Sequence, residues 1–269
     1  HGLRQRGAPD ARRRVNAALH LEWLKARRAT TVRAATVILA VLVPAMSAGL
    51  LAVVRSDSGS ALALKATALL TDTGWAGITG FSAQITSVAG LLAVGVVVSW
   101  VFGREFTDGT SGALFATPTP LGSVATAKIL IVTAWGVLTS CLAALLTLAA
   151  GVLIGLGVPD SGAWVGAGRI AVVGALTVLL TLPLALVASF ARGYLPAISA
   201  LLVLVVITQV VVALGAGSWF PYAAPGIWSG LGGPELADAV TAPQLLLALP
   251  VGVVAAAGTW LWWQKATVQ

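Results

Sequence analysis

The sequence predicts an all-α integral membrane protein whose chain crosses the membrane six times. Of its 269 residues, 58% are hydrophobic and only 9% are charged, and the mean hydropathy is +0.95. A soluble domain carries about 25% charged residues, so a water-soluble chain of this composition could not cover its surface. Uncharged runs of about 20 residues, the length that crosses a bilayer, recur along the chain.

Six apolar runs are long enough to cross the bilayer as helices. The first has no charged residue and is longer than the apolar part of a cleaved signal peptide, so we expect it to be retained. The second stops before Arg104, the fourth contains Pro183, and the fifth begins near Pro196. The third is about 33 residues long and must tilt or project beyond the bilayer. The expected spans, within one transmembrane domain at 34–269, are 34–54, 79–102, 124–156, 166–190, 195–214 and 243–263.

Basic residues set the expected orientation. Nine of the sixteen basic residues lie in residues 1–33, and with two acidic residues subtracted this tail carries the whole net charge of +7. The N-terminus is therefore expected in the cytoplasm, and six crossings return the C-terminus there too. Arg55, Lys65 and Arg169 fall on the outer side and depart from this trend.

Residues 1–33 are expected to form a cytoplasmic basic tail with an amphipathic helix. In the segment VNAALHLEWLKARR the apolar stripe consists of Val15, Leu19, Trp23 and Ala26. A basic helix with Trp on its apolar face is typical of helices in the membrane interface, and anionic lipid would attract it by about 1 kcal/mol per basic residue. A solvated tail or a simple orientation signal are the alternatives. A nucleic-acid partner is disfavoured, because the first membrane span holds this basic segment close to the bilayer.

The segment GREFTDGTSGALFATPTP lies between the second and third spans, on the expected cytoplasmic side. We expect a short surface helix at about 104–117. Glu105 and Asp108 would fall in its first turn, where negative charge suits the helix dipole. Pro118 would end it, because proline lacks a backbone donor and disfavours helix at the preceding residue. The alternative is a polar loop that merely avoids lipid.

Two segments resemble the type-2 ABC exporter permeases, and within them the small single-domain permeases of the bacterial drug- and peptide-export type. These segments are LEWLKARR and GREFTDGTSGALFATPTPLGSVATAK. The family has an elbow helix before the first span and a cytoplasmic motif of Glu, Gly-Thr, Leu, Pro and Lys. Here the motif positions are Glu105, Gly109, Thr110, Leu114, Pro118 and Lys128. The chain has Leu121 and Gly122 where the family often has a basic residue.

The resemblance implies a permease of the bacterial cell membrane that exports a compound or moves it between leaflets. Residues 104–117 would be the coupling helix, docking on a separate ATPase present in two copies, beside a second copy of the permease or a paralogue. ATP and Mg would bind the ATPase, since this chain has no Gly-Lys pair and hence no P-loop. The coupling positions would be Arg104, Glu105, Asp108, Gly109, Thr110, Leu114 and Pro118. The elbow positions would be Leu19, Glu22, Trp23 and Lys25.

Within that family, Glu105 and Asp108 would meet basic or amide groups of the ATPase, or would hold their own loop by capping. The outer segment 215–240 would be a re-entrant hairpin that closes the translocation path. Its gate candidates are Trp219, Phe220, Tyr222 and Trp228. The alternative is an interfacial loop anchored by these aromatics, since Trp and Tyr are enriched at membrane interfaces.

The spans offer little polar lining, and no ionisable residue lies deep in any of them. Intramembrane charges usually mark ion or proton routes, so their absence favours apolar or amphipathic cargo moving between two copies of the chain. The polar positions are Gln84, Thr86, Ser87, Ser99, Thr133, Thr139, Ser140, Thr208 and Gln209. Trp260, Trp262 and Trp263 are expected to form an inner interfacial belt.

Two other classes of protein were weighed against a transporter. An intramembrane protease needs a base or a metal site, but the only histidines are His1 and His20, and no His-Glu-x-x-His motif occurs. A phosphate transferase needs clustered carboxylates for metal, and Glu105 with Asp108 is a thin set. A non-transporting sensor or assembly factor remains compatible with the sequence.

Overall fold

A computed structural model describes residues 7–56, 61–70, 72–110, 112 and 120–266. Within these residues the fold is entirely helical, without a β-strand. Six helical runs are long and apolar enough to cross a membrane, which confirms the predicted number. They are Thr30–Arg55, Trp75–Thr107, Leu121–Leu153, Ser161–Phe190, Tyr194–Ala213 and Ala242–Lys265. Each overlaps the run expected from the sequence.

The N-terminal part consists of α1 (Gly7–Arg28) and a first span in three pieces: α2 (Thr30–Val37), the π-helical turn η1 (Ile38–Leu42) and α3 (Val43–Arg55). The π turn directly precedes Pro44, the second residue of α3. Proline lacks an N–H and its ring clashes with the carbonyl four residues earlier, and a π turn absorbs that mismatch. α1 packs along α7 (Leu121–Leu153).

The centre of the bundle consists of α5 (Trp75–Thr107), α7 and α8 (Ser161–Thr181), which pack together over long stretches. Glycines on α8 permit the close approach. A Cβ on Gly174 would lie 2.1 Å from Oγ of Ser140 on α7, and one on Gly166 would lie 2.2 Å from Oγ1 of Thr79 on α5. Small residues at helix contacts are the usual means of close packing in membranes.

The remaining spans are more peripheral. The fourth span breaks at Leu182 into α8 and α9 (Pro183–Phe190), as its proline requires. A turn leads to α10 (Tyr194–Ala213), and the last span consists of α13 (Ala242–Leu246) and α14 (Ala248–Lys265). Only 11% of the most apolar part of α10 is buried within the chain. This helix therefore offers an apolar face to lipid or to another protein.

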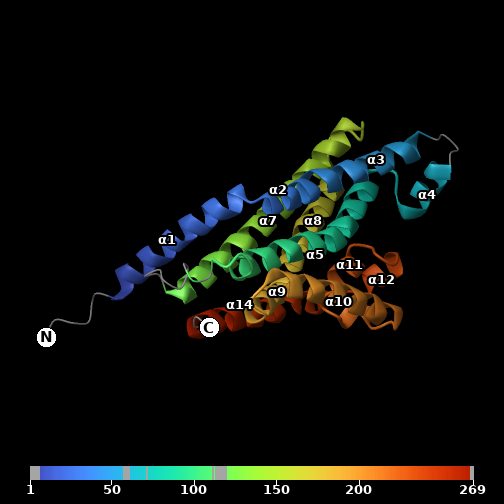
Figure 1. Ribbon diagram of the computed structural model, residues 1–269. Coiled ribbons are helices and arrows are strands. Elements are labelled where there is room, and N and C mark those ends of the chain that lie inside the picture. Colours follow the sequence, from blue (N-terminus) through green and yellow to red (C-terminus); the bar gives the residue numbers. More distant parts are fainter. Residues whose placement is uncertain (1–6, 57–60, 71, 111, 113–119, 267–269) are drawn as a thin grey trace.

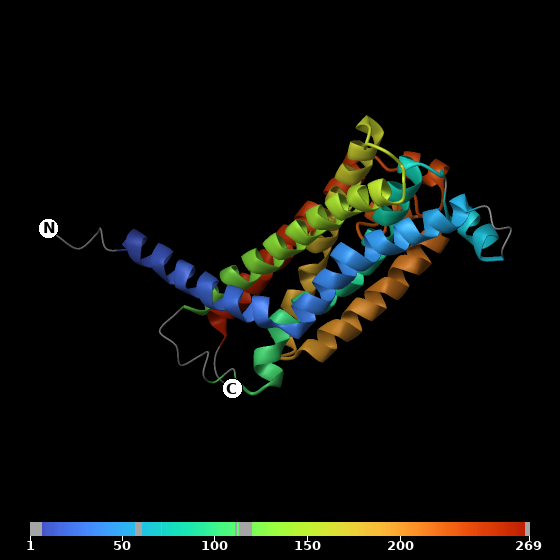
Figure 2. The same cartoon turned by 90° about the horizontal axis from the view of Figure 1, so that it is seen from above.

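Figures 1 and 2 show that α1 and the end of α14 lie at one end of the bundle, which we call the inner end. The opposite, outer end carries α4 (Ala61–Leu69), η2 (Gly217–Trp219), α11 (Ala224–Trp228) and α12 (Pro234–Asp238). The third span ends three residues earlier than expected, at Leu153. Gly155 and Gly157 follow it with φ of 83° and 82°, a left-handed conformation that stops a helix.

Candidate functional site

A cluster of four charged side chains joins three helices at the inner end. Nζ of Lys25 on α1 lies 2.7 Å from Oε1 of Glu22 and 3.0 Å from Oε1 of Glu105 on α5. Nζ of Lys128 on α7 lies 3.0 Å from Oε2 of Glu22 and 3.2 Å from Oε2 of Glu105. Each carboxylate therefore bridges two ammonium groups. We call these four residues the inner charge cluster.

The inner charge cluster is buried and electrically balanced. The Lys128 side chain is fully buried, those of Glu22 and Glu105 are each 7% exposed, and that of Lys25 is 41% exposed. Two carboxylates and two ammonium groups give a net charge of zero. Nζ of Lys128 also donates a hydrogen bond of 2.9 Å to the carbonyl of Val101. Buried charges are tolerated when they are paired and hydrogen-bonded, and here Oε2 of Glu105 has the ion-pair contact with Lys128 but no hydrogen bond.

The two charged residues on α1 respond to this environment. Burial raises the pKa of Glu22, but the charge of Lys128 and hydrogen bonds from Lys25 and Lys128 outweigh it and hold that pKa below its ordinary value. Burial lowers the pKa of Lys25, but its hydrogen bond to Glu22 and the charges of Glu105 and Glu22 raise the pKa above the ordinary lysine value. Both groups stay charged at neutral pH.

The position of Glu105 corrects a prediction. It was expected in the first turn of a helix at 104–117, but α5 continues to Thr107, so Glu105 lies in the last turn of α5. The helix ends at Thr107, and Gly109, whose φ is +68°, turns the chain away just after it. A carboxylate is unfavourable at the carbonyl end of a helix. Lys25 and Lys128 supply the positive charge that makes this position tolerable.

The other coupling positions are distributed as follows. Arg104 is half-buried, with its guanidinium carbon 4.4 Å from the ring centre of Trp100. Asp108, Gly109 and Thr110 are exposed. The hydroxyl of Thr110 donates a hydrogen bond of 3.3 Å to the carbonyl of Glu105. Leu114 and Pro118 lie outside the described residues.

The helix α1 packs on the bundle through one face and leaves much of its apolar stripe outward. Within that stripe, which the sequence places in the membrane interface, Trp23 is 48% exposed and Leu19 is half-buried, whereas Ala26 is buried. The buried described positions on α1 are Ala18, Glu22 and Ala26, and Ala29 directly after the helix is buried too. The reason is electrostatic: α1 must turn Glu22 toward Lys128, and this leaves Trp23 outward.

The C-terminal tryptophans also differ from prediction. Trp263 was expected in an interfacial belt, but it is completely buried. Its Nε1–H donates a hydrogen bond of 2.8 Å to Oγ of Ser189, and its ring packs edge-on against Phe102 and Phe106 at centroid distances of 6.3 and 5.9 Å. Trp260 remains 38% exposed. Trp263 thus joins α14 and α9 to the end of α5 beside the inner charge cluster.

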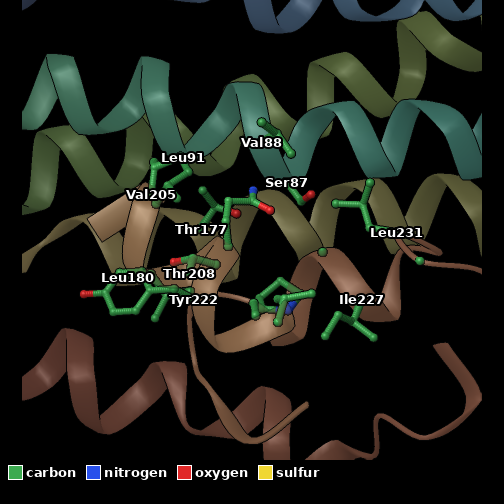
Figure 3. Close-up of a pocket in the computed structure, with 16 residues that line it drawn as sticks. Ser87, Val88, Leu91, Thr177, Leu180, Val205, Thr208, Tyr222, Ile227 and Leu231 are labelled. Atoms are coloured by element: carbon green, nitrogen blue, oxygen red, sulfur yellow. The ribbon is translucent and has the colours of Figure 1, made fainter. Parts of the chain in front are cut away.

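A second candidate site is a cavity of about 320 Å³ further toward the outer end. Its walls come from α5, α8, α10, α11 and the chain on either side of α11. Figure 3 shows Ser87, Thr177 and Thr208 reaching the same space from three different helices. Sequence reasoning had marked Ser87, Thr208 and Gln209 as polar positions but not Thr177, whose hydroxyl was hidden in an apolar run. We call this space the outer cavity.

The four gate candidates lie in different surroundings. Tyr222 alone lines the outer cavity. Phe220 and Trp228 pack beside Ala223, Ala224 and Ile227, whereas Trp219 is 66% exposed. The guanidinium carbon of Arg169 lies 5.0 Å from the Trp228 ring centre. Residues 223–227 are all buried, and α11 contacts α5 and α8.

These features define a polytopic α-helical membrane protein with the inner charge cluster at one end and the uncharged outer cavity toward the other. The family profile described as "ABC-2 family transporter protein" matches residues 18–209, or 192 of the 269 residues. The chain therefore belongs to the ABC-2 transporter family, as the motifs predicted, and is a transporter permease rather than an enzyme. No curated protein sequence matches it. The match includes the whole inner charge cluster and stops before α11 and α14.

Proposed function

We propose that this permease is powered by a separate ATPase that docks at the inner end, on residues 104–117. Two ATPase copies would act on two permease copies, or on this chain and a paralogue, in a bacterial cell membrane. The inner end would face the cytoplasm, in agreement with the basic residues of the tail. The cargo would be exported or moved between leaflets.

The inner charge cluster is the observation that carries this proposal. Its member Glu105 lies in the last turn of α5, within residues 104–117, and ties that turn to Lys25 on α1 and Lys128 on α7. A force that the ATPase exerts on residues 104–117 would therefore act on α1, α5 and α7 together. A buried pair resists separation, because parting it leaves an uncompensated charge at a penalty of about 3–5 kcal/mol.

A second contact, at Gly103, would transmit the same force from α5 to the fifth span, α10. Gly103 packs against the backbone of the α9–α10 turn, where an added Cβ would lie 2.3 Å from the amide nitrogen of Tyr194. There is no room for a side chain at position 103, so the end of α5 and the start of α10 are in close backbone contact. Movement of the α5 end would thus reach α10, which is among the walls of the outer cavity.

The two acidic coupling positions would have different roles. Glu105 is buried and shared between Lys25 and Lys128, so it would position the docking segment rather than touch the ATPase. Asp108 is exposed at the helix end and is available to a basic or amide group of a partner. The two residues would thus divide the two roles expected for them, with Asp108 meeting the ATPase and Glu105 holding the chain in place.

The outward face of α1 fits a membrane surface. Trp23 is 48% exposed, and the exposed basic residue Arg27 lies one turn further along the same face of the helix. An apolar ring beside fixed positive charge is the arrangement that binds anionic lipid at the interface. We infer that α1 is an elbow helix whose inner face holds α5 and α7 while its outer face contacts lipid.

A pull-down of the tagged chain from its native membrane in mild detergent, followed by mass spectrometry, tests the proposal. We expect a P-loop ATPase in stoichiometric amount. Asp108→Ala should reduce its recovery, whereas the matched change Asp238→Ala, at an exposed position of the outer end, should not. A chain recovered without any ATPase would overturn the proposal and would favour a sensor or an assembly factor.

A further inference from the structure

We propose that the outer cavity is a binding site within a single copy of the chain for an uncharged small molecule with an apolar body and a hydrogen-bond donor. This inference rests on the transport function proposed above, because it makes the occupant the cargo. It places the cargo among α5, α8, α10 and α11 rather than between two copies. The argument rests on the size, charge and polar atoms of the cavity.

The volume of the outer cavity falls within the range of known ligand pockets. Ligand pockets in proteins measure about 300–1,000 Å³ and are mostly apolar, with a few polar groups that fix orientation. The outer cavity has about 320 Å³. Leu91, Leu180 and Val205 provide apolar wall from three different helices.

The charge of the walls selects against ions. Among the described residues that line the outer cavity, none is Asp, Glu, Lys or Arg. Tyr222 is the one that could ionise, and burial raises its pKa to about 12, so it is neutral at physiological pH. A charged ligand would lose its hydration without gaining a counter-ion, and this penalty is large in an apolar site.

Three hydroxyls of the walls offer acceptors to a ligand donor. The hydroxyls of Ser87, Thr177 and Thr208 already donate to carbonyls of their own helices, at 2.7, 2.8 and 2.8 Å. Their oxygens keep free lone pairs and can accept a hydrogen bond. A ligand O–H or N–H would use them, whereas a lipid acyl chain would leave them unmatched.

The outer wall is formed by α11 and the chain around it. A Cβ on Gly226 would lie 3.2 Å from Oγ of Ser87 and 3.0 Å from Cδ1 of Leu231, so α11 fits closely against α5. Tyr222 lies at the edge of the space, with its hydroxyl pointing away from the other labelled side chains (Figure 3). The ring therefore contributes an apolar face, and the segment covers the cavity from the outer end.

Photolabelling of the purified permease in lipid nanodiscs, without any ATPase, tests this site. The probe is 3-azioctanol, an uncharged alcohol whose diazirine reacts with neighbouring side chains on illumination. We expect saturable labelling of cavity residues on α5, α8 and α10, mapped by peptide mass spectrometry. Excess 1-octanol should displace it, and equal concentrations of octanoate or octylammonium should not. Labelling that rises linearly and falls only on lipid-facing positions would overturn the proposal.

Two neighbouring valines of α10 provide matched variants. Val205 lines the outer cavity, whereas Val206 is 62% exposed and lies outside the lining. Val205→Trp should reduce saturable labelling at least tenfold, and Val206→Trp should leave it unchanged. Thr208→Val keeps the volume and removes the hydroxyl, so it should weaken the apparent affinity about 2- to 10-fold. Equal labelling of all three variants would contradict the assignment.

The result is independent of the ATPase. If a P-loop ATPase co-purifies with the chain but the outer cavity takes no saturable label, the cargo site is wrong and the proposed function stands. If the cavity is labelled as expected but no ATPase is recovered, the chain binds the alcohol without being a powered exporter. The two proposals thus fail separately.

Discussion

Replacing Lys128 by Met removes the most deeply buried member of the inner charge cluster. Methionine matches the length of the stem but lacks the ammonium group, so two ion-pair contacts, at 3.0 and 3.2 Å, and the 2.9 Å hydrogen bond to Val101 are lost. Glu22 and Glu105 then share only Lys25, and the cluster carries a net charge of −1. Breaking a buried pair from one side typically costs about 3–5 kcal/mol.

We expect Lys128→Met to lower the free energy of unfolding by about 3–5 kcal/mol. Unfolding in mixed micelles with increasing SDS, followed by tryptophan fluorescence, measures this quantity. The matched control is Lys65→Met on α4, because Lys65 is exposed and a surface change usually stays within about 0.5 kcal/mol. A loss for Lys128→Met within 1 kcal/mol of the control would, by the same scale, refute the reasoning.

A double-mutant cycle separates the ion pair from general packing. Glu105→Gln combined with Lys128→Met removes one charge of each sign, so the cluster is neutral again. The double variant should be more stable than the sum of the two single losses predicts, with a coupling of about 0.5–3 kcal/mol. Strict additivity would mean that the two side chains do not interact across α5 and α7.

Three further predictions concern other parts of the molecule. Gly174→Leu should prevent stable packing of α8 on α7, since even a Cβ would lie 2.1 Å from a serine hydroxyl, and yield of monodisperse protein in size-exclusion chromatography reports this. Trp263→Ala should cost about 3–5 kcal/mol in the same SDS unfolding, whereas Trp260→Ala at an exposed position should cost much less; equal losses would contradict the buried placement. The pKa of Glu22 is lowered by folding, so its contribution to stability is present above the ordinary carboxyl pKa and is lost as pH falls through the lower, folded value. The pKa of Lys25 is raised by folding, so its contribution is lost as pH rises through its folded value. Stability measured against pH should therefore be flat around neutrality, and Glu22→Gln should flatten the acidic limb.

The spans could be predicted because an apolar run of bilayer length has few alternatives. Their ends were less predictable, since they depend on single residues such as Gly155, whose left-handed backbone stops α7. The break at Leu182 followed from the proline after it. A feature of the backbone can thus be predicted from the sequence where a single residue, such as Pro183, determines it.

The inner charge cluster could not be read from the sequence, although each member was singled out. Glu22 and Lys128 are 106 positions apart, and Lys25 and Glu105 are 80 apart. Helix-dipole reasoning placed Glu105 at the start of a new helix, because its positive partners on α1 and α7 were unknown. The available signal was an acidic residue at the inner end of one expected span and a basic residue near the start of the next.

The buried tryptophan illustrates the same limit. For Trp260, which is 38% exposed, a place in the membrane interface stays a prediction. Trp263 is buried because Ser189, 74 positions away, accepts its N–H and because Phe102 and Phe106 surround its ring. Tryptophan is buried instead of interfacial when the tertiary structure supplies both an apolar site for its ring and a hydrogen-bond acceptor for its N–H.

Site-specific photocrosslinking at the inner end, in the native membrane, tests whether an ATPase docks there. A benzophenone amino acid replaces Thr107, which is exposed in the last turn of α5 beside Asp108, and a second variant carries it at the exposed Ser56 of the outer end. Docking of an ATPase on the inner end predicts a covalent adduct between position 107 and a P-loop ATPase, and no such adduct from position 56. Adducts with lipid alone at position 107, or the same protein captured from both positions, would contradict it.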